Sequence, residues 1–327
     1  RSPLSPSSAA SDVYKRQMYN KAVAIINEVR KAVVGKDEII AKILMAILAQ
    51  GHILLEDCPG VGKTTMVLAF SKALDLSYKR LQFTPEILPG DVVGYTVINR
   101  ETGKTEYRPG AALCNLFLAD EINRTSSKTQ SALLEAMEEG SITVDGTTHI
   151  IPRPYTVIAT QNPIGSTGTQ LLPESQMDRF IIKISIGYPS INDEVRILKQ
   201  KQGQNPLDNV GKVADKNDII EMQKSVENIY ISDEVYEYIA RLAAATRNSP
   251  MIKMGASPRA SIALARMSRA AAWVSRREYV VPEDVQNVFF DVFEHRILIN
   301  SRAGVSGASA HTALEDVLKR VSAPRLS

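Results

Sequence analysis

Residues 53–65 read Ile53-Leu54-Leu55-Glu56-Asp57-Cys58-Pro59-Gly60-Val61-Gly62-Lys63-Thr64-Thr65, an apolar run followed by a glycine-rich turn. The apolar run predicts a short buried strand over residues 53–55, and residues 66–73 predict a helix after the turn. Two glycines let the backbone N–H groups face inward at a helix N-terminus, where the helix dipole favours anions. Lys63 adds a positive charge for the outer phosphates, and Thr64 offers a hydroxyl to Mg²⁺. The stretch therefore predicts a nucleoside triphosphate site.

The residues expected to contact the phosphates lie in and directly after this turn. They are Pro59, Gly60, Val61, Gly62, Lys63, Thr64 and Thr65. The stretch departs once from the pattern G-x-x-x-x-G-K-[ST], because Asp57 replaces the first glycine. The alternative is a turn that carries Gly-Lys-Thr by chance. The strand before the turn, the helix after it and Pro59 within it favour the phosphate site.

A second acidic element is expected at the end of another buried strand, and Leu116-Phe117-Leu118-Ala119-Asp120-Glu121 supplies it. Asp120 is expected to hold Mg²⁺ through its water shell, and Glu121 to polarise the water that attacks the γ-phosphate. Adjacent strand residues point to opposite faces, so both can serve only where the strand ends. An Asp-Glu pair can also simply begin a helix, since acids favour a first turn. The phosphate loop favours the catalytic interpretation.

Composition suits an intracellular protein with one large and one small domain. The chain has 327 residues, 44% hydrophobic content and a net charge of +3. No apolar run approaches the roughly 20 residues that span a membrane. Two cysteines favour a reducing compartment over a disulfide framework, and we expect a cytoplasmic location. The near-neutral charge argues against a sequence-independent grip on nucleic acid.

The first 17 residues differ from the rest of the chain. Residues 1–17 are rich in Ser, Ala and Pro, lack periodicity and precede Met18. They contain no apolar core like that of a signal peptide. We therefore expect residues 1–17 to be a disordered, non-native leader.

From Tyr19 onward helical and strand-like segments alternate, as a parallel sheet covered by helices requires. Strands are expected at residues 53–55, 79–83, 116–119, 155–159 and 181–186, and helices at 19–32, 37–50, 66–73 and 128–139. Tyr188-Pro189 marks a hinge, after which every expected element is a helix: 193–202, 218–225, 233–246, 258–275, 282–293 and 313–321. The predicted architecture is an α/β nucleotide-binding domain over residues 18–188 and a helical lid domain over residues 189–327.

Two insertions interrupt the alternation, and each is expected to form a β-hairpin. In the first, residues 95–98 and 105–108 flank a turn that contains Gly103. In the second, residues 142–144 and 148–150 bracket Asp145-Gly146, a strong hairpin signal. Taken alone, both hairpins are better interpreted as surface loops without function.

The chain as a whole resembles the MoxR family of AAA+ ATPases in the helix-2-insert clade, over residues 18–324. Beside the two hairpins and the phosphate loop, the resemblance is carried by several long strings. They are Gln82-Phe83-Thr84-Pro85, Leu88-Pro89-Gly90-Asp91, Leu118-Ala119-Asp120-Glu121-Ile122-Asn123-Arg124, Thr129-Gln130-Ser131-Ala132-Leu133-Leu134-Glu135-Ala136-Met137, Ile158-Ala159-Thr160-Gln161-Asn162-Pro163 and Leu172-Pro173-Glu174-Ser175-Gln176-Met177-Asp178-Arg179-Phe180. The resemblance implies a P-loop AAA+ core, a parallel sheet flanked by helices, and a C-terminal all-helical lid. It also tolerates Asp57, because members of the family vary there.

The resemblance implies roles for three further residues. Asn162 looks like the sensor-1 amide that orients the attacking water, although an asparagine before proline is equally a turn former. Arg179 looks like an arginine finger that reaches a neighbouring subunit's γ-phosphate; the alternative is an intrachain salt bridge with Asp178 or Glu174. Arg259 looks like sensor-2, in contact with the same chain's nucleotide.

For Arg259 the alternative is a solvated helix residue, and Arg247 and Arg266 are rival candidates for sensor-2. Val34 and Gly35 are expected to line the adenine pocket by their main chain. Cys58 in the phosphate loop is either a redox-sensitive thiol, since a helix N-terminus and Lys63 lower a thiol pKa, or a small residue that fills space.

As a function, the resemblance implies hydrolysis of ATP with Mg²⁺ by a homo-oligomer, commonly a hexameric ring. Such proteins act as chaperones that remodel or mature partner proteins, and MoxR-like members are associated with von Willebrand factor A domain proteins and metal-cofactor insertion. Two alternatives stay open: a nucleic-acid motor or loader, and a regulatory switch that hydrolyses ATP slowly. No Asn-Lys-x-Asp guanine signature is present.

Overall fold

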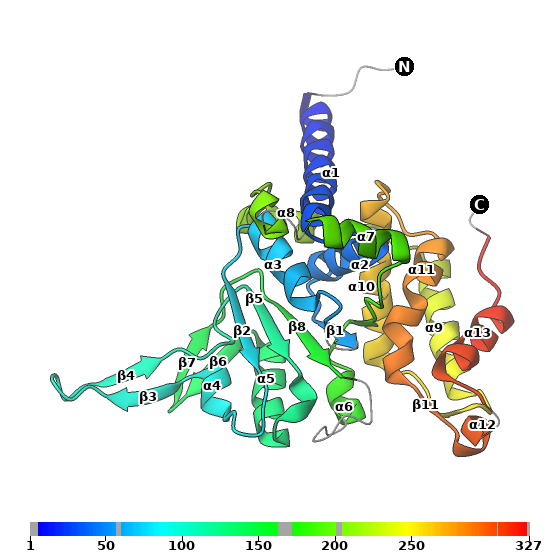
Figure 1. The fold of residues 1–327 in the computed structure, drawn as a ribbon. Helices are drawn as coiled ribbons and strands as arrows, with labels where there is room; N and C mark the ends of the chain where they lie inside the picture. The colour runs from blue at the N-terminus through cyan, green and yellow to red at the C-terminus, as the bar shows by residue number, and fades with distance from the viewer. Residues whose placement is uncertain (1–5, 57–59, 163–171, 201–204, 306, 326–327) are drawn as a thin grey trace.

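A five-stranded parallel sheet lies at the centre of the computed structural model, which describes residues 6–56, 60–162, 172–200, 205–305 and 307–325 (Figure 1). The strand order is β2-β5-β8-β1-β9. The strands are β1 (Ile53–Glu56), β2 (Tyr78–Gln82), β5 (Leu116–Asp120), β8 (Thr156–Gln161) and β9 (Ile182–Ile184). Every pair in this sheet is parallel. The carboxyl ends of β1, β5 and β8 therefore meet at one edge, as the α/β prediction requires.

Each face of the sheet is covered by its own hydrophobic core, which explains why β5 and β8 are buried along their whole length. Leu118 and Ile158 face the core formed by α1 (Pro6–Ala32), α2 (Asp37–Leu48), α3 (Lys63–Ala73) and the lid helices. Phe117 and Val157, one residue earlier in each strand, face the other core, beneath α5 (Ser127–Glu139). The period of two along each strand separates the two layers.

Helix α1 corrects the expectation of disorder over residues 1–17, because it begins at Pro6 and continues to Ala32. The helix predicted from Tyr19 onward can extend toward the N-terminus, because adding residues to an existing helix costs less free energy than starting a new one. Lys15 within this stretch forms an ion pair with Glu278 at 2.5 Å. Figure 1 shows the first turns of α1 projecting from the body. That residues 1–17 are a non-native leader stays a prediction.

Both insertions form the expected hairpins. β3 (Tyr95–Ile98) pairs with β4 (Thr105–Arg108), and β6 (Ser141–Val144) with β7 (Thr147–Ile150). Asp145 and Gly146 both have positive φ, which a two-residue turn of this kind requires. The ring of Tyr107 on β4 stacks on His149 of β7 with centroids 3.7 Å apart. The two hairpins thus lie together as one arm beside α4 (Pro89–Val93) (Figure 1).

The C-terminal part is the predicted helical lid, with one addition. Its elements are α7 (Ile191–Gln200), η2 (Pro206–Asn209), α8 (Lys216–Glu227), α9 (Asp233–Arg247), α10 (Pro258–Val274), α11 (Pro282–Phe293), η3 (Glu294–Arg296), α12 (Ser301–Val305) and α13 (Ala310–Arg320). A two-stranded antiparallel sheet joins β10 (Ile252–Met254) to β11 (Leu298–Ile299). This small sheet was not predicted, because such short strands leave no periodicity in the sequence. The domain boundary at residue 188 stays a prediction.

Two short elements, η1 (Ile122–Arg124) and α6 (Glu174–Met177), complete the core. None of the helices within the described ranges has the length and apolar character that crossing a bilayer requires.

Candidate functional site

The phosphate loop leaves β1 and enters α3 with two residues in the left-handed region. Gly60 has φ of 89° and Gly62 has φ of 93°. A Cβ at either position would meet no atom of the described residues within 4 Å, so it is the positive φ that favours glycine there. Asp57, Cys58 and Pro59 lie outside the described residues, so the expectations for Pro59 and for the Cys58 thiol stay predictions.

The first turn of α3 provides the polar groups of the loop. Lys63 is the first residue of the helix and its side chain is buried, with 9% exposure. Thr64 and Thr65 follow in the same turn and are half-buried, and Val61 packs on the core below. The N–H groups of a first turn have no intrahelical acceptor. The loop therefore presents a lysine, hydroxyls and backbone donors together, which matches the chemistry of a triphosphate with Mg²⁺.

Asp120 is the last residue of β5, is buried, and has both carboxylate oxygens engaged. Thr160 on the neighbouring strand β8 donates its hydroxyl to Oδ1 at 2.6 Å. Arg80 on β2 donates Nη2 to Oδ2 at 2.6 Å and Nε to the same oxygen at 3.2 Å. Two adjacent strands thus fix the carboxylate, and the Arg80 guanidinium neutralises it.

Glu121 follows directly, in a left-handed conformation with φ of 57°, which is strained for a glutamate. Its N–H donates to Thr160 Oγ1 at 2.8 Å, so one threonine anchors both acids. Partial burial raises the pKa of Glu121, but hydrogen bonds from Arg124 and Asn162 outweigh this and hold the pKa below its ordinary value. The side chain is therefore a carboxylate at neutral pH and can accept a proton.

Asn162 comes directly after β8, next to Glu121. Its Nδ2 donates to Glu121 Oε1 at 3.0 Å, while its Oδ1 is buried and has no hydrogen-bond partner among the described residues. Asn123 holds the Asn162 carbonyl at 3.3 Å, and its own Oδ1 is orphaned in the same way. Orphaned buried acceptors are rare, and here two lie beside the acids. They fit a site in which water or a ligand completes the polar network.

Val34 and Gly35 lie in the turn between α1 and α2, where adenine contacts were expected. Val34 is buried, and Gly35 has φ of 70°. A Cβ on Gly35 would lie 2.2 Å from the Asp193 carboxylate of α7. The Asp193 side chain thus lies against the Gly35 backbone, whose positive φ favours glycine, and the adenine role of the turn stays a prediction.

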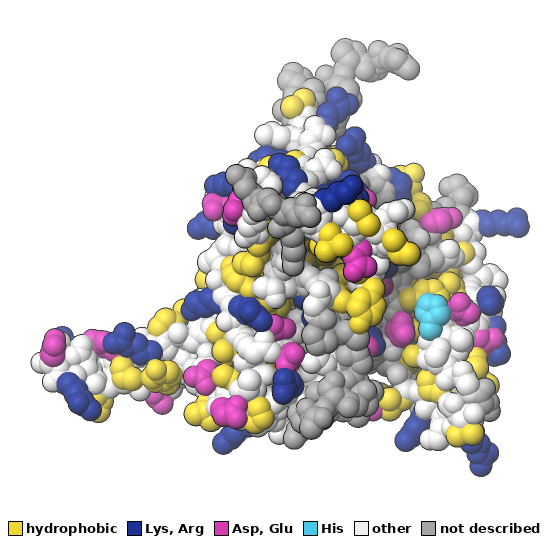
Figure 2. Space-filling model, viewed as in Figure 1, with side chains coloured by type: hydrophobic (Ala, Val, Ile, Leu, Met, Phe, Trp, Pro, Cys, Tyr) yellow, Lys and Arg dark blue, Asp and Glu magenta, His cyan; other side chains and the backbone are white. Residues whose placement is uncertain are grey.

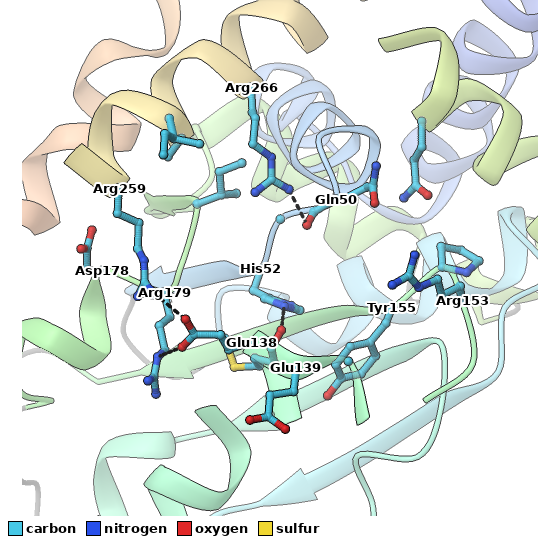
Figure 3. A pocket seen from close by; sticks show the side chains of 18 of the residues that line it. Gln50, His52, Glu138, Glu139, Arg153, Tyr155, Asp178, Arg179, Arg259 and Arg266 are labelled. Atoms are coloured by element: carbon cyan, nitrogen blue, oxygen red, sulfur yellow. Dashed lines mark hydrogen bonds and ion pairs between the residues drawn. The ribbon is translucent and has the colours of Figure 1, made fainter. Parts of the chain in front are cut away.

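Arg179 and Arg259 do not join this cluster, and the structure corrects the placement of Arg259. Both cations contact Glu138 at the end of α5: Arg179 Nε lies 2.8 Å from Oε2, and Arg259 Nη2 lies 2.6 Å from Oε1 (Figure 3). The carbonyl oxygen of the preceding residue, Met137, lies 3.0 Å from Nε2 of His52, which comes just before β1. The pair therefore lies at the amino edge of the sheet, opposite Lys63. Arg259 was expected beside its own chain's nucleotide, but α10 packs against the other edge.

The two rival candidates for sensor-2 also form hydrogen bonds away from the phosphate loop, one at this edge of the sheet and one within the lid. Arg266 donates to the backbone carbonyls of Ala49 and Gln50, and Arg247 donates to Ala256 O. The salt bridge of Arg179 is with Glu138, not with Asp178 or Glu174 as the alternative supposed. Asp178 is instead paired with Arg296 at 2.7 Å.

These side chains surround a cavity of about 370 Å³ between the core and the lid. Five arginines and three acids line it, most of them labelled in Figure 3: Arg153, Arg179, Arg259, Arg266 and Arg296, with Glu138, Glu139 and Asp178. Burial lowers the pKa of Arg266, whose hydrogen bonds go to carbonyls rather than to a carboxylate. The amino edge is thus a basic pocket, suited to a negatively charged group from outside the chain.

Three residues of the site escaped sequence reasoning: Arg80, Thr160 and Glu138. Arg80 and Thr160 act through strand pairing, since β2 and β8 flank β5 and bring them beside Asp120. Glu138 lies within the helix predicted over residues 128–139, which was noted only for its apolar spacing. No signal in the sequence marks these pairings, because they depend on which strands become neighbours.

Two family models match the chain. One, described as the ATPase family associated with various cellular activities (AAA), matches residues 52–182, and one described as an AAA lid domain matches residues 244–317. The first contains the phosphate loop, Asp120, Glu121 and Asn162. The second contains Arg259.

Similar proteins match over nearly the whole chain. An uncharacterized Bacillus subtilis protein, YeaC, is 45% identical, covering 94% of this chain and 95% of that protein. Chaperone MoxR1 of Mycobacterium tuberculosis is 36% identical, covering 92% of this chain and 82% of that protein. The crystal structure of a candidate ATPase from Cytophaga hutchinsonii superposes with a TM-score of 0.91 at 37% identity, covering 98% of this chain and 99% of that one.

Proposed function

Since the chain belongs to the MoxR family of AAA+ ATPases, we propose that it hydrolyses ATP to ADP and phosphate and uses the energy to remodel partner proteins. One observation carries the hydrolysis proposal: three neighbouring strands end at the same edge with complementary groups. β1 leads into Lys63 and its helix N-terminus, β5 ends at Asp120 and Glu121, and β8 ends beside Asn162.

The reaction follows from these groups. Lys63 and the first turn of α3 hold the outer phosphates, while Thr64 and Asp120 would hold Mg²⁺. When bound, the metal neutralises charge on the phosphates. Glu121, a carboxylate at neutral pH, accepts a proton from the attacking water. Asn162 donates to Glu121, so it orients the base that positions this water.

In this proposal, a complete catalytic site forms only where two subunits meet. Arg179 and Arg259 lie at the edge of the sheet opposite the chain's own phosphate loop, at a part-exposed pocket. An arginine that meets a γ-phosphate stabilises the charge that develops in transfer. We place both arginines against the nucleotide of a neighbouring subunit, with Arg259 in trans rather than in cis. The resulting homo-oligomer is a closed ring, commonly six subunits in such proteins.

The arm of two hairpins is the proposed tool for remodelling. Its exposed apolar side chains include Tyr95, Ile98 and Ile150. The stack of Tyr107 on His149 joins the hairpins, and β6 follows α5, whose end holds the trans arginines. A change at the subunit interface can therefore move the arm. A chaperone role agrees with the name of the MoxR1 relative. Clients of the proposed kind are von Willebrand factor A domain proteins and complexes that mature or receive metal cofactors.

A nucleic-acid motor is the less favoured alternative. In Figure 2, dark blue Lys and Arg side chains are interspersed with magenta Asp and Glu over the described residues of the visible face. Motors on nucleic acid generally carry a continuous basic patch. A slow regulatory switch has one supporting contact, because Arg124 pairs with Glu121 at 2.8 Å and restrains the base.

Mg²⁺-dependent phosphate release from ATP tests the hydrolysis proposal, with Lys63→Ala as the variant. We expect Lys63→Ala to lose ATP binding and turnover, and GTP to be a poorer substrate than ATP. Lys72→Ala is the matched control, because Lys72 lies in the last turn of the same helix and is part-exposed. Equal loss in both variants, or none in either, would contradict the assignment of the phosphate loop.

A further inference from the structure

Glu138 joins two cations that come from separate parts of the chain. Its Oε1 lies 2.6 Å from Arg259 Nη2, and its Oε2 lies 2.8 Å from Arg179 Nε (Figure 3). Arg179 belongs to the core just before β9, and Arg259 opens α10 in the lid. One carboxylate thus holds the two arginines that the proposed mechanism needs for a neighbour's phosphate.

The position of Glu138 is electrostatically unfavourable within its own helix. It is the second-last residue of α5, where the helix carries a partial negative charge that disfavours a carboxylate. Helix stability therefore does not explain an acid there. The two arginines are what offsets its charge.

The contact with Arg179 is close but poorly made. The Arg179 Nε–H is buried and forms no aligned hydrogen bond with any described residue, although Glu138 Oε2 is 2.8 Å away. A single carboxylate cannot balance two guanidinium groups, so the trio keeps a net positive charge. A phosphate offers more oxygens and more negative charge, and would satisfy both arginines better.

The trio is also accessible and easily exchanged. The exposed fractions of the side chains are 31% for Arg179, 42% for Glu138 and 47% for Arg259. Ion pairs this exposed contribute little to stability. An incoming anion can therefore displace the carboxylate without disturbing the fold.

We propose that Glu138 stands where the γ-phosphate of a neighbouring subunit's ATP binds, and holds Arg179 and Arg259 together until that phosphate displaces it. The inference rests on the proposed function. Glu138 is then a positioning residue that competes with the phosphate. Its displacement costs free energy, which subtracts from what a neighbour's bound triphosphate contributes to assembly.

The test compares Glu138→Gln with wild type in a Glu121→Gln background that retains ATP. The protein concentration at half-assembly is measured by size-resolved mass, with ATP and without nucleotide. With ATP, loss of the competing carboxylate should lower this concentration by roughly twofold to fivefold, the range that one weak ion pair allows. Without nucleotide, Glu138→Gln should assemble like its parent. Glutamine removes an unfavourable charge from the helix end, so the variant should fold.

Glu139→Gln is the matched control. It removes the same charge from the next residue, which is also exposed and for which the described part of the chain shows no hydrogen bond or ion pair. The control should leave the half-assembly concentration unchanged. A concentration that is unchanged or raised in Glu138→Gln, or lowered equally in Glu139→Gln, overturns the inference. If Arg179→Ala leaves ATP turnover intact, the proposed function fails instead, whatever Glu138 does.

Discussion

Asn162 donates its Nδ2–H to Oε1 of Glu121 over 3.0 Å, and this bond joins the end of β8 to the end of β5. The two side chains are 41 positions apart in the chain. The parallel pairing of β5 with β8 brings them together, and Thr160 strengthens the junction by binding both Asp120 and the Glu121 backbone. The base and the residue that orients it therefore form one unit.

Asn162→Ala should shift the acid limb of the pH–rate profile to higher pH. The hydrogen bond from Asn162 stabilises the charged form of Glu121 and lowers its pKa, so its removal raises that pKa. Steady-state ATP hydrolysis measured from pH 5 to 8 checks the direction. An unmoved acid limb would mean that Asn162 does not tune the base.

Glu121→Gln should reduce turnover by about 10²- to 10⁴-fold, the usual contribution of a general base. ATP binding should persist, because Glu121 lies beyond the phosphate loop and is replaced by an isosteric amide. Phosphate release and binding of a fluorescent ATP analogue, measured on the same sample, separate the two effects. Loss of binding in proportion to turnover would assign Glu121 a structural role.

Arg80→Gln should destabilise the ligand-free protein by about 1 kcal/mol, because it strips the buried Asp120 of a partner that is itself 45% exposed. Adding Mg²⁺ and ATP should raise the melting temperature more in this variant than in wild type, since the metal replaces the lost positive charge. Lys79→Gln, one residue earlier on β2, is the control. Equal ligand-induced shifts in the variant and wild type would count against a link between Arg80 and the metal.

Stability should fall as the pH drops from about 6.5 to 4. Burial lowers the pKa of His52 to about 4, from an ordinary 6.5, and its ring contacts the Met137 carbonyl and the Val157 N–H. A group with a lowered pKa binds its proton more readily when unfolded, so the stability present above 6.5 is lost progressively below it. At pH 5 the loss amounts to about 2 kcal/mol.

His52→Gln should flatten this dependence without abolishing it, because burial also keeps the pKa of His295 well below its ordinary value. His311→Gln, at a half-exposed site, is the control variant. Melting temperatures between pH 7.5 and 5 check both variants. A His52→Gln slope equal to wild type would exclude His52 as the source.

Sequence patterns were sufficient for the architecture of the core. Alternating apolar segments located all five strands, and Asp145-Gly146 located the turn of the second hairpin. Gly60 and Gly62 were predicted for their conformational freedom and do adopt positive φ. These features are local, because each depends on residues within a few positions of one another.

Features that depend on distant neighbours were not accessible in this way. The pairing of Arg80 with Asp120 requires β2 to lie next to β5, which no short segment encodes. The resemblance placed Arg259 beside its own chain's nucleotide, whereas its contact with Glu138 lies at the opposite edge of the sheet and depends on how α10 packs. Residues 6–17 lack periodicity, yet continue a helix that begins to pack at Met18.

The central claim is that ATP hydrolysis needs Arg179 of a neighbouring subunit. ATPase rate per chain against protein concentration tests it most directly, with size-resolved mass on the same samples, for wild type, Arg179→Ala and the control Arg153→Ala. Arg153 lines the same cavity and is exposed. We predict that activity rises with assembly in wild type and the control, while Arg179→Ala binds ATP and turns over at least tenfold more slowly at every concentration. A flat rate per chain together with a normal Arg179→Ala would place the whole reaction within one subunit and contradict the account.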